Sequence, residues 1–270
     1  MSAGAEPARI LAFGACGRMG ERVRAAVAAD PAACLGGAVE APAHPELGAK
    51  LEDGVVLTDD LATALAGCDA AIAFATPGPS LALARAAAGA GVPCAIGTTG
   101  FSEAERGELE SIAGEIPLCV AANFSVAVNV HFHLTRLAAE LLGPDFDAEL
   151  VELHHSAKVD APSGTALRLA EAVAEGRGQR LADHQVLARQ GITGPRAEGT
   201  IGIQTLRGGD NPGEHTVHFI GQGERLELVH RSATRDHFAR GALRAALWLR
   251  GRPPCLYDME QILGLGNETV

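Results

Sequence analysis

The sequence predicts an α/β fold with a doubly wound parallel sheet, followed by a second domain of mixed α+β structure. Over the first half of the chain, short apolar runs alternate with helical stretches, which is typical of consecutive βαβ units. A glycine-rich loop directly follows the first of these runs. After Asn123 the pattern changes, and one long helical stretch leads into several strand-like runs. The 270 residues therefore suit two domains of ordinary size.

The first domain is expected to open with a buried strand at residues 9–13 and a helix at residues 18–29, which stops at Asp30 and Pro31. A second strand fits residues 35–40. The remaining strands are expected at residues 70–74, 94–96 and 118–121, with helices at residues 79–90 and 102–113. Elements that alternate in this way form a parallel sheet covered by helices on both faces.

The second domain is expected to begin with one long helix over residues 126–142. A strand at residues 149–154 and a helix at residues 164–174 follow it. Three further strands are expected at residues 200–207, 214–221 and 225–231. The helix at residues 236–249 is apolar on one face, so we expect it to return and complete the first domain.

The composition favours a small-molecule ligand. The formal net charge is -11 and the pI is near 5.4, which disfavours nucleic acid and anionic membrane surfaces, because both attract clustered Lys and Arg. The six cysteines are scattered without a CxxC pair, and we interpret them as reduced thiols. No secretory signal and no membrane span is predicted, so a cytoplasmic location is expected.

The glycine-rich loop has the spacing G-x-x-G-x-x-G and lies between the first strand and the first helix. Glycine lets the backbone turn tightly and lets a pyrophosphate approach main-chain N–H groups, while the helix N-terminus adds partial positive charge. The loop therefore predicts a dinucleotide site in a Rossmann-type domain. The alternative is a turn that needs glycine for its dihedral angles and binds nothing. The predicted contacts are Gly14, Ala15, Cys16, Gly17, Arg18 and Met19.

Glu40 ends the second predicted strand, about 20 residues after Gly20, where a carboxylate can bind the ribose diol of a dinucleotide. The same carboxylate repels a 2′-phosphate, so NADH is favoured over NADPH. Residues 41–43 supply no cation to offset this repulsion, which leaves Arg18 and Lys50 as the possible substitutes. The alternative is a surface glutamate at a strand end, with no role in binding.

The stretch over residues 149–166 combines a strand, a polar turn and the start of a helix. His154 and Lys158 fall where side chains converge after a strand, and either can donate a proton. Residues 162–165 supply the first turn of the helix, whose N–H groups suit a carboxylate. Taken singly, each residue has a structural explanation, such as a half-buried strand histidine or a solvated lysine. Together they predict a site for an anion that must also be protonated.

No metal site is expected. His131 and His133 are two positions apart on a predicted helix, so they point to different faces and are interpreted as structural. The histidines His215, His218 and His230 fall in predicted strands, with no acid or cysteine at ligand spacing.

These motifs together resemble the 4-hydroxy-tetrahydrodipicolinate reductase (dihydrodipicolinate reductase) family over residues 10–258. The resemblance includes the glycine loop, the strings at residues 97–100 and 121–125, the stretch 149–166 and Gly-Glu-His at residues 213–215. It implies a Rossmann-type domain joined by hinges to a substrate domain whose sheet assembles a homotetramer. Residues 1–125 and 235–270 would form the dinucleotide-binding domain, and residues 126–234 the substrate-binding and tetramerisation domain.

The resemblance also implies roles for residues of the catalytic stretch. His154 matches the proton donor or acceptor of the family, and Lys158 matches its proton donor. His155, Gly164 and Thr165 match contacts to the carboxylates of the substrate.

Contacts to the nicotinamide side of the cofactor are implied for Gly97, Thr98, Thr99, Ala121, Ala122, Asn123 and Phe124. The chain departs from the family pattern at two positions. Ala73 stands where an Asp is common, and Ala41 stands where some members have Arg. The second departure bears on the use of NADPH.

The implied activity is the reduction of 4-hydroxy-tetrahydrodipicolinate, a small dicarboxylate, to tetrahydrodipicolinate with loss of water. NADH, NADPH or both would serve as the cofactor, and the step belongs to lysine and diaminopimelate biosynthesis. Two other functions remain open. Another two-domain NAD(P)-dependent dehydrogenase of amino-acid metabolism would share the glycine loop without needing residues 154–165. A non-catalytic dinucleotide sensor would keep the fold and have lost turnover.

Overall fold

The computed structural model describes residues 6–265, which form two compact units. One unit contains the described residues up to Val126 together with those from Arg235 onward, and the other is Ala127–Thr234. Each unit has its own sheet and its own apolar core. Because the chain leaves the first unit and later returns to it, that unit is discontinuous in sequence.

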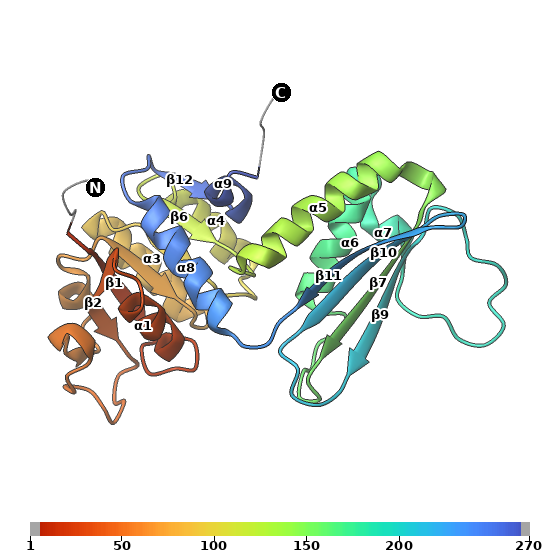
Figure 1. Ribbon diagram of the computed structural model, residues 1–270. Helices are drawn as coiled ribbons and strands as arrows, with labels where there is room; N and C mark the ends of the chain where they lie inside the picture. Colours follow the sequence, from red (N-terminus) through yellow and green to blue (C-terminus); the bar gives the residue numbers. More distant parts are fainter. Residues whose placement is uncertain (1–5, 266–270) are drawn as a thin grey trace. The chain divides into compact units, whose positions relative to one another are not determined.

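The first unit is built on a seven-stranded parallel sheet (Figure 1). The strands are β1 (Ala8–Phe13), β2 (Ala33–Val39), β3 (Leu57–Thr58), β4 (Ala70–Ala73), β5 (Cys94–Ile96), β6 (Pro117–Val120) and β12 (Cys255–Tyr257). They lie in the order β12-β6-β5-β4-β1-β2-β3, so the sheet winds outward from β1 in both directions. This is the doubly wound, Rossmann-type arrangement, and the predicted fold class is confirmed.

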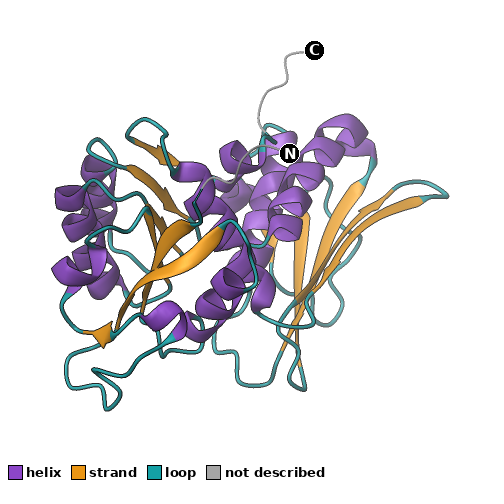
Figure 2. Ribbon diagram, turned by 60° about the vertical axis from the view of Figure 1, so that its left-hand side comes forward, coloured by secondary structure: helices purple, strands orange, loops and turns teal. Residues whose placement is uncertain are grey.

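Helices cover both faces of this sheet (Figure 2). They are α1 (Gly20–Ala28), η1 (Glu52–Gly54), α2 (Leu61–Leu65), α3 (Pro77–Ala90), α4 (Glu103–Ile112), α8 (Asp236–Leu249) and α9 (Met259–Leu263). Ile10 of β1 packs in one cluster with α1, α8 and α9, whereas the next residue, Leu11, packs in another with α2, α3 and α4. Successive side chains of a strand point to opposite faces, so the continuous apolar run in β1 forms part of two cores.

Helix α8 returns to the first unit, as the sequence predicts. Small buried residues, Ala239, Ala242 and Ala246, allow it to approach the sheet closely. The approach is tightest at Gly241, where a Cβ atom would lie 1.7 Å from the carbonyl oxygen of Phe124. Any side chain at position 241 would therefore push α8 away from the segment that follows β6.

The second unit has a five-stranded mixed sheet in the order β11-β10-β7-β9-β8. Its strands are β7 (Asp147–His154), β8 (Gln185–Val186), β9 (Ile201–Arg207), β10 (Glu214–Ile220) and β11 (Arg225–Arg231). Strand β10 runs antiparallel to β7 and β11, whereas β9 is parallel to β7 and β8. The mixed architecture predicted for this part of the chain is therefore confirmed.

Two long helices pack on one face of this sheet. The helical segments of the unit are α5 (Val126–Leu142), η2 (Gly143–Asp145), α6 (Gly164–Gly176) and α7 (Leu181–His184). Leu150 of β7 packs with Phe132 of α5 and Leu169 of α6. Burial alternates along β7, so that its last two residues on the covered face are Glu152 and His154. Two polar side chains therefore occupy the end of an otherwise apolar face.

Candidate active site

The glycine loop joins β1 to α1 and is tied to the neighbouring strand. The N–H groups of Gly14 and Ala15 donate to the carbonyl of Val39, at 2.8 and 3.0 Å. Gly14 has a φ of 71°, in the left-handed region that favours glycine. At Gly20, a Cβ atom would lie 1.9 Å from the carbonyl oxygen of Gly14. The loop thus closes on itself so tightly that residue 20, where α1 begins, has no room for a side chain.

Glu40 lies directly against this loop. One oxygen of its carboxylate accepts a hydrogen bond from the N–H of Cys16 at 3.0 Å, and the other accepts one from the N–H of Ala41 at 2.9 Å. The N–H of Glu40 itself donates to the carbonyl of Thr58. The fold therefore brings together the loop and the acid that the sequence pairs by spacing alone.

The residues expected on the nicotinamide side follow two neighbouring parallel strands, β5 and β6. Thr98 is buried, and its hydroxyl lies 2.6 Å from that of Ser80 and donates to the carbonyl of Ala75 at 2.8 Å. Phe124 is also buried. These two side chains face into the protein, whereas Thr99 and Ala122 are exposed at the ends of the strands. Ser80, which lies in α3 and fixes the orientation of Thr98, is not among the residues expected from the sequence.

A close packing of rings accompanies these strand ends. The rings of Phe74 and Phe124 meet edge to face, with centroids 5.9 Å apart. A Cβ atom on Gly97 would lie 2.2 Å from the ring of Phe74. Glycine at position 97 is therefore required by the aromatic ring beneath it. Ala73, one of the two departures from the family pattern, is fully buried at the end of β4.

In the second unit, His154 ends β7 and is held by Glu152 two residues earlier on the same face. Nδ1 of His154 lies 2.5 Å from a carboxylate oxygen of Glu152. His154 is 8% exposed and Glu152 is 1% exposed. The other ring nitrogen, Nε2, lies beside Gly213, where a Cβ atom would be 2.8 Å away. The imidazole is thus confined between a carboxylate on one side and a glycine backbone on the other.

Glu152 is the centre of a buried hydrogen-bond network. Its carboxylate accepts two hydrogen bonds from Arg207, at 2.8 and 2.9 Å. It also accepts one from the N–H of Ser163 and one from the hydroxyl of Thr205, each at 3.1 Å. Burial raises the pKa of Glu152, but the hydrogen bonds from Arg207 and His154 outweigh it and hold that pKa below its usual value. The carboxylate is therefore ionised at neutral pH.

The pKa of His154 is lowered from its ordinary value. Burial is the largest cause, and the nearby charges of Lys158 and Arg207 add to it, while the hydrogen bond with Glu152 acts in the opposite direction. His154 is therefore neutral at neutral pH. An ionised Glu152 accepts only a proton-bearing Nδ1, so this partner selects the tautomer that leaves the Nε2 lone pair free.

Lys158 lies in the turn after β7. Its N–H donates to the carbonyl of His155 at 3.1 Å, and its ammonium nitrogen lies 2.8 Å from a carboxylate oxygen of Asp160. The side chain of Lys158 is 21% exposed, so it remains accessible to a ligand. Asp160, whose pKa is lowered mainly by Lys158, was not among the expected site residues.

Helix α6 begins directly after this turn. Ser163 is its N-cap, and its hydroxyl accepts a hydrogen bond from the N–H of Ala166 at 3.1 Å. The same hydroxyl lies 3.0 Å from Nε2 of His215. Gly164 and Thr165 form the first turn, and Gly164 is exposed with open space where a Cβ would be. Two of the three predicted carboxylate contacts, Gly164 and Thr165, therefore lie at a helix N-terminus that directly follows the turn holding Lys158.

The buried histidines of this unit make its stability depend on pH. Burial lowers the pKa of His131 to about 4 and that of His215 to about 3. Below about pH 6.5, the ordinary pKa of histidine, the unfolded chain takes up protons that the folded unit does not. The stability of the folded unit therefore decreases as the pH is lowered. At about pH 5 this amounts to about 2 kcal/mol for each histidine, at 1.36 kcal/mol per pKa unit.

Urea unfolding at about pH 7.5 and about pH 5 tests this expectation, with His131→Leu as the matched variant. The loss of unfolding free energy between the two pH values should be about 2 kcal/mol smaller in His131→Leu than in the parent. Carboxylates contribute equally to both proteins, so they cancel in this comparison. An identical loss in both proteins would contradict the assignment.

The first unit has a Rossmann-type glycine loop beside Glu40, and the second has an imidazole, a lysine and a helix N-terminus. This combination is typical of a nicotinamide-dependent oxidoreductase. The family model for the N-terminus of dihydrodipicolinate reductase matches residues 8–124, and the model for the C-terminus matches residues 127–263. The chain belongs to the dihydrodipicolinate reductase family, as its motifs predict.

Individual relatives agree with this assignment. A protein of Anaeromyxobacter dehalogenans (strain 2CP-1), named 4-hydroxy-tetrahydrodipicolinate reductase, is 47% identical over 264 residues, covering 95% of this chain and 98% of the relative. One of the same name from Geobacter sulfurreducens is 47% identical over 268 residues, covering 95% and 99%. The fold is shared with a dipicolinate-bound dihydrodipicolinate reductase from Paenisporosarcina sp. TG-14, at a TM-score of 0.78 and 24% identity over 95% of this chain and 99% of that one.

Proposed function

We propose that the protein reduces 4-hydroxy-tetrahydrodipicolinate to tetrahydrodipicolinate with loss of water, using NAD(P)H, in lysine and diaminopimelate biosynthesis. The names of its relatives support this activity. The observation that carries the proposal is the turn after β7, where Lys158, the neutral imidazole of His154 and the N-terminus of α6 occur together. This combination suits a dicarboxylate that must be protonated during reduction.

The residues of the second unit have distinct roles in this proposal. The first turn of α6, at Gly164 and Thr165, and the side chain of His155 bind the carboxylates of the substrate. Lys158 donates the proton. His154, held by Glu152, presents its free Nε2 lone pair as a hydrogen-bond acceptor that orients the reacting group.

The chemistry needs one hydride and one proton. The reduced nicotinamide, when bound, supplies the hydride. Loss of the 4-hydroxyl as water leaves a conjugated imine, and hydride addition at its electrophilic carbon gives an enamine. A proton from Lys158 then completes the reduction, and a correctly placed acid is worth about 10²- to 10⁴-fold in rate. The positive charge of Lys158 also stabilises the negative charge that develops on the substrate.

The first unit is proposed to bind the cofactor. The loop from Gly14 to Met19 would hold the pyrophosphate at its helix end, through the N–H groups of Arg18 and Met19, because those of Gly14, Ala15 and Gly17 donate to carbonyls of the protein. The side chain of Arg18 is exposed at the edge of the loop. Residues 97–99 and 121–124, at the ends of β5 and β6, would contact the nicotinamide side. Because the carboxylate of Glu40 lies against the loop, we expect NADH to be preferred.

Glu40→Ala tests that preference. Removing the carboxylate takes away the acceptor for the ribose diol of NADH and the repulsion felt by a 2′-phosphate. The dissociation constant of NADH is therefore expected to rise by about 10-fold, the equivalent of about 1.4 kcal/mol, while that of NADPH falls or stays the same. Fluorescence titration with each cofactor measures the ratio of the two dissociation constants. Equal weakening of both would show that Glu40 does not discriminate between them.

We also propose a homotetramer assembled through the second unit. The face of its sheet opposite α5 and α6 carries Leu206, 51% exposed, and Val229, 43% exposed, beside the half-buried Val151 and Leu153. An apolar face of this kind suits contacts between subunits.

Among residues 6–265, no helix is long and apolar enough to span a membrane. The biosynthetic role is the ground for proposing a cytoplasmic location.

The decisive experiment follows oxidation of NADH and NADPH with substrate made freshly by the preceding synthase from pyruvate and aspartate semialdehyde. Rapid oxidation that depends on the substrate would support the proposed activity, and the two rates would give the cofactor preference. If both cofactors bind and neither is oxidised, a different dehydrogenase activity or a dinucleotide sensor would be the better explanation.

A further inference from the structure

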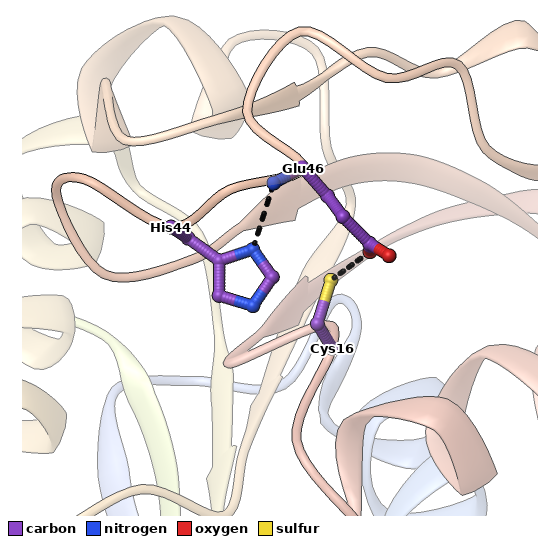
Figure 3. A group of neighbouring side chains, drawn as sticks. All are labelled: Cys16, His44 and Glu46. Atoms are coloured by element: carbon purple, nitrogen blue, oxygen red, sulfur yellow. Dashed lines mark hydrogen bonds between the residues drawn. The ribbon is translucent and has the colours of Figure 1, made fainter.

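Three side chains that the proposed reaction does not use lie together beside Glu40 in the first unit. They are Cys16, from the glycine loop, and His44 and Glu46, from the loop that follows β2 (Figure 3). The thiol of Cys16 donates to the carboxylate of Glu46 at 3.4 Å, and Nδ1 of His44 accepts a hydrogen bond from the N–H of Glu46 at 3.3 Å. One ligand atom from each residue lies within 4.8 Å of the other two.

The chemistry of the three groups matches one class of ligand. A thiolate, an imidazole and a carboxylate are the three donors that zinc prefers in proteins, and bonds of about 2.0 to 2.3 Å to a shared ion place donors roughly 3.5 Å apart. A contraction of about 1 Å would bring the present atoms to that spacing. His44 and Glu46 lie on a loop with exposed residues at 41–43, so the movement involves little packed structure.

The surroundings of the thiol favour a cation. Two carboxylates lie beside Cys16: that of Glu46 accepts the hydrogen bond of the thiol, and that of Glu40 accepts one from the N–H of Cys16. A divalent ion that displaces the thiol proton would stand between the sulfur and the carboxylate of Glu46 and offset the repulsion between their negative charges. Cys16 and His44 are half-buried and Glu46 is exposed, so the fourth ligand position is left open to water.

We propose that Cys16, His44 and Glu46 bind a thiophilic divalent cation of the Zn²⁺ type, and that the bound ion competes with the dinucleotide. On binding, Cys16 loses one proton to solvent, and its thiolate becomes a ligand together with the imidazole and the carboxylate. The inhibitory part rests on the proposed function, since Cys16 belongs to the loop proposed to hold the pyrophosphate. The metal-binding part stands independently of it.

No metal site is expected from the sequence, and the cluster of Cys16, His44 and Glu46 is a departure from that expectation. Cys16 and His44 are far apart along the chain, and neither falls in a usual ligand spacing. Only the pairing of β1 with β2 brings the two loops together.

Titration of the purified full-length protein with Co²⁺ tests the binding, because thiolate ligation to Co²⁺ produces a charge-transfer band in the near ultraviolet. We expect the band to saturate at one Co²⁺ per chain, to vanish in Cys16→Ser and to persist in Cys255→Ser, which removes an exposed cysteine outside the cluster. Zn²⁺ should displace the Co²⁺. Absence of the band, or its persistence in Cys16→Ser, would overturn the site. This measurement requires no turnover and no cofactor.

Competition is measured separately, by NADH fluorescence at increasing Zn²⁺. In the parent protein, the apparent dissociation constant of NADH should rise linearly with the concentration of Zn²⁺. His44→Ala should keep its NADH affinity, and at least about ten times more Zn²⁺ should be needed for the same effect. Unchanged NADH binding at saturating Zn²⁺ would overturn the inhibitory part. If the cofactor competes with Zn²⁺ but no substrate is reduced, the site stands and the proposed function fails.

Discussion

Lys158→Ala is expected to lower kcat by about 10²- to 10⁴-fold, the range that a general acid contributes, with little change in the affinity for NADH. The side chain of Lys158 lies in the turn between β7 and α6, 2.8 Å from Asp160 and partly open to solvent. Alanine removes both the transferable proton and the positive charge. Steady-state kinetics, together with NADH titration by fluorescence, separate the chemical step from cofactor binding.

Lys158→Arg is the matched variant, since it keeps the charge. Guanidinium remains protonated in proteins, so arginine supports the binding of an anionic substrate but does not release a proton. We expect a near-normal KM with a kcat as low as that of Lys158→Ala. A kcat close to the parent value in either variant would remove Lys158 from the role of proton donor.

Glu152→Gln is expected to have the second largest effect, and it should act on both stability and catalysis. The buried carboxylate accepts hydrogen bonds from Arg207, Thr205, Ser163 and His154. An amide has one oxygen in place of two, and its NH₂ group would face either Arg207 or His154, which are both donors. We expect a loss of about 3 kcal/mol in the free energy of unfolding, at the low end for a broken buried ion pair because Arg207 is partly exposed.

The catalytic effect of Glu152→Gln follows from its position beside His154. Without the carboxylate, the proton on Nδ1 loses its partner, and the tautomer with a free Nε2 is no longer selected. Wrong tautomers are costly in enzymes that depend on an oriented imidazole, and we expect kcat to fall by about 10²-fold or more. Because Glu152 raises the pKa of His154, the acidic limb of the kcat/KM profile should move to lower pH.

Thr205→Val is the control for this variant. It removes one hydrogen bond to Glu152 while keeping the charge of Glu152 and its contact with His154. We expect a loss of about 1 kcal/mol in stability and an unchanged pH profile. If Glu152→Gln also retained the parent pH profile, Glu152 would be a structural residue without influence on His154.

The long elements of the fold were predictable because their signals are local. The strand at residues 9–13, the loop after it and the long helix from Val126 each show in a single window of sequence. The two-residue strands β3 and β8 and the three-residue β12 have no such signal. They form because a neighbouring strand offers unpaired backbone groups, and that partner lies outside the short window of sequence in which a strand is recognised.

The candidate site was predictable to a similar degree. The glycine loop, Glu40, His154 and Lys158 belong to short motifs, and the fold places Glu40 on the loop as expected. Arg207 was missed because it comes from β9, and only the pairing of β9 with β7 brings it to Glu152. Glu152 itself has a recognisable signal in the sequence. It is an acid on the covered face of an alternating strand, two residues before a histidine, and such an acid must have a buried partner.

The return of α8 to the first unit affects the order in which the protein can be completed during synthesis. Until residues 236–249 leave the ribosome, the face of the sheet that carries Ile10 and Ile72 lacks the helix that covers it. The second unit is continuous in sequence and emerges in between. The second unit can therefore fold while the nascent chain is still attached, whereas the first unit is finished last. A chain terminated before α8 would expose an apolar surface and be prone to aggregation.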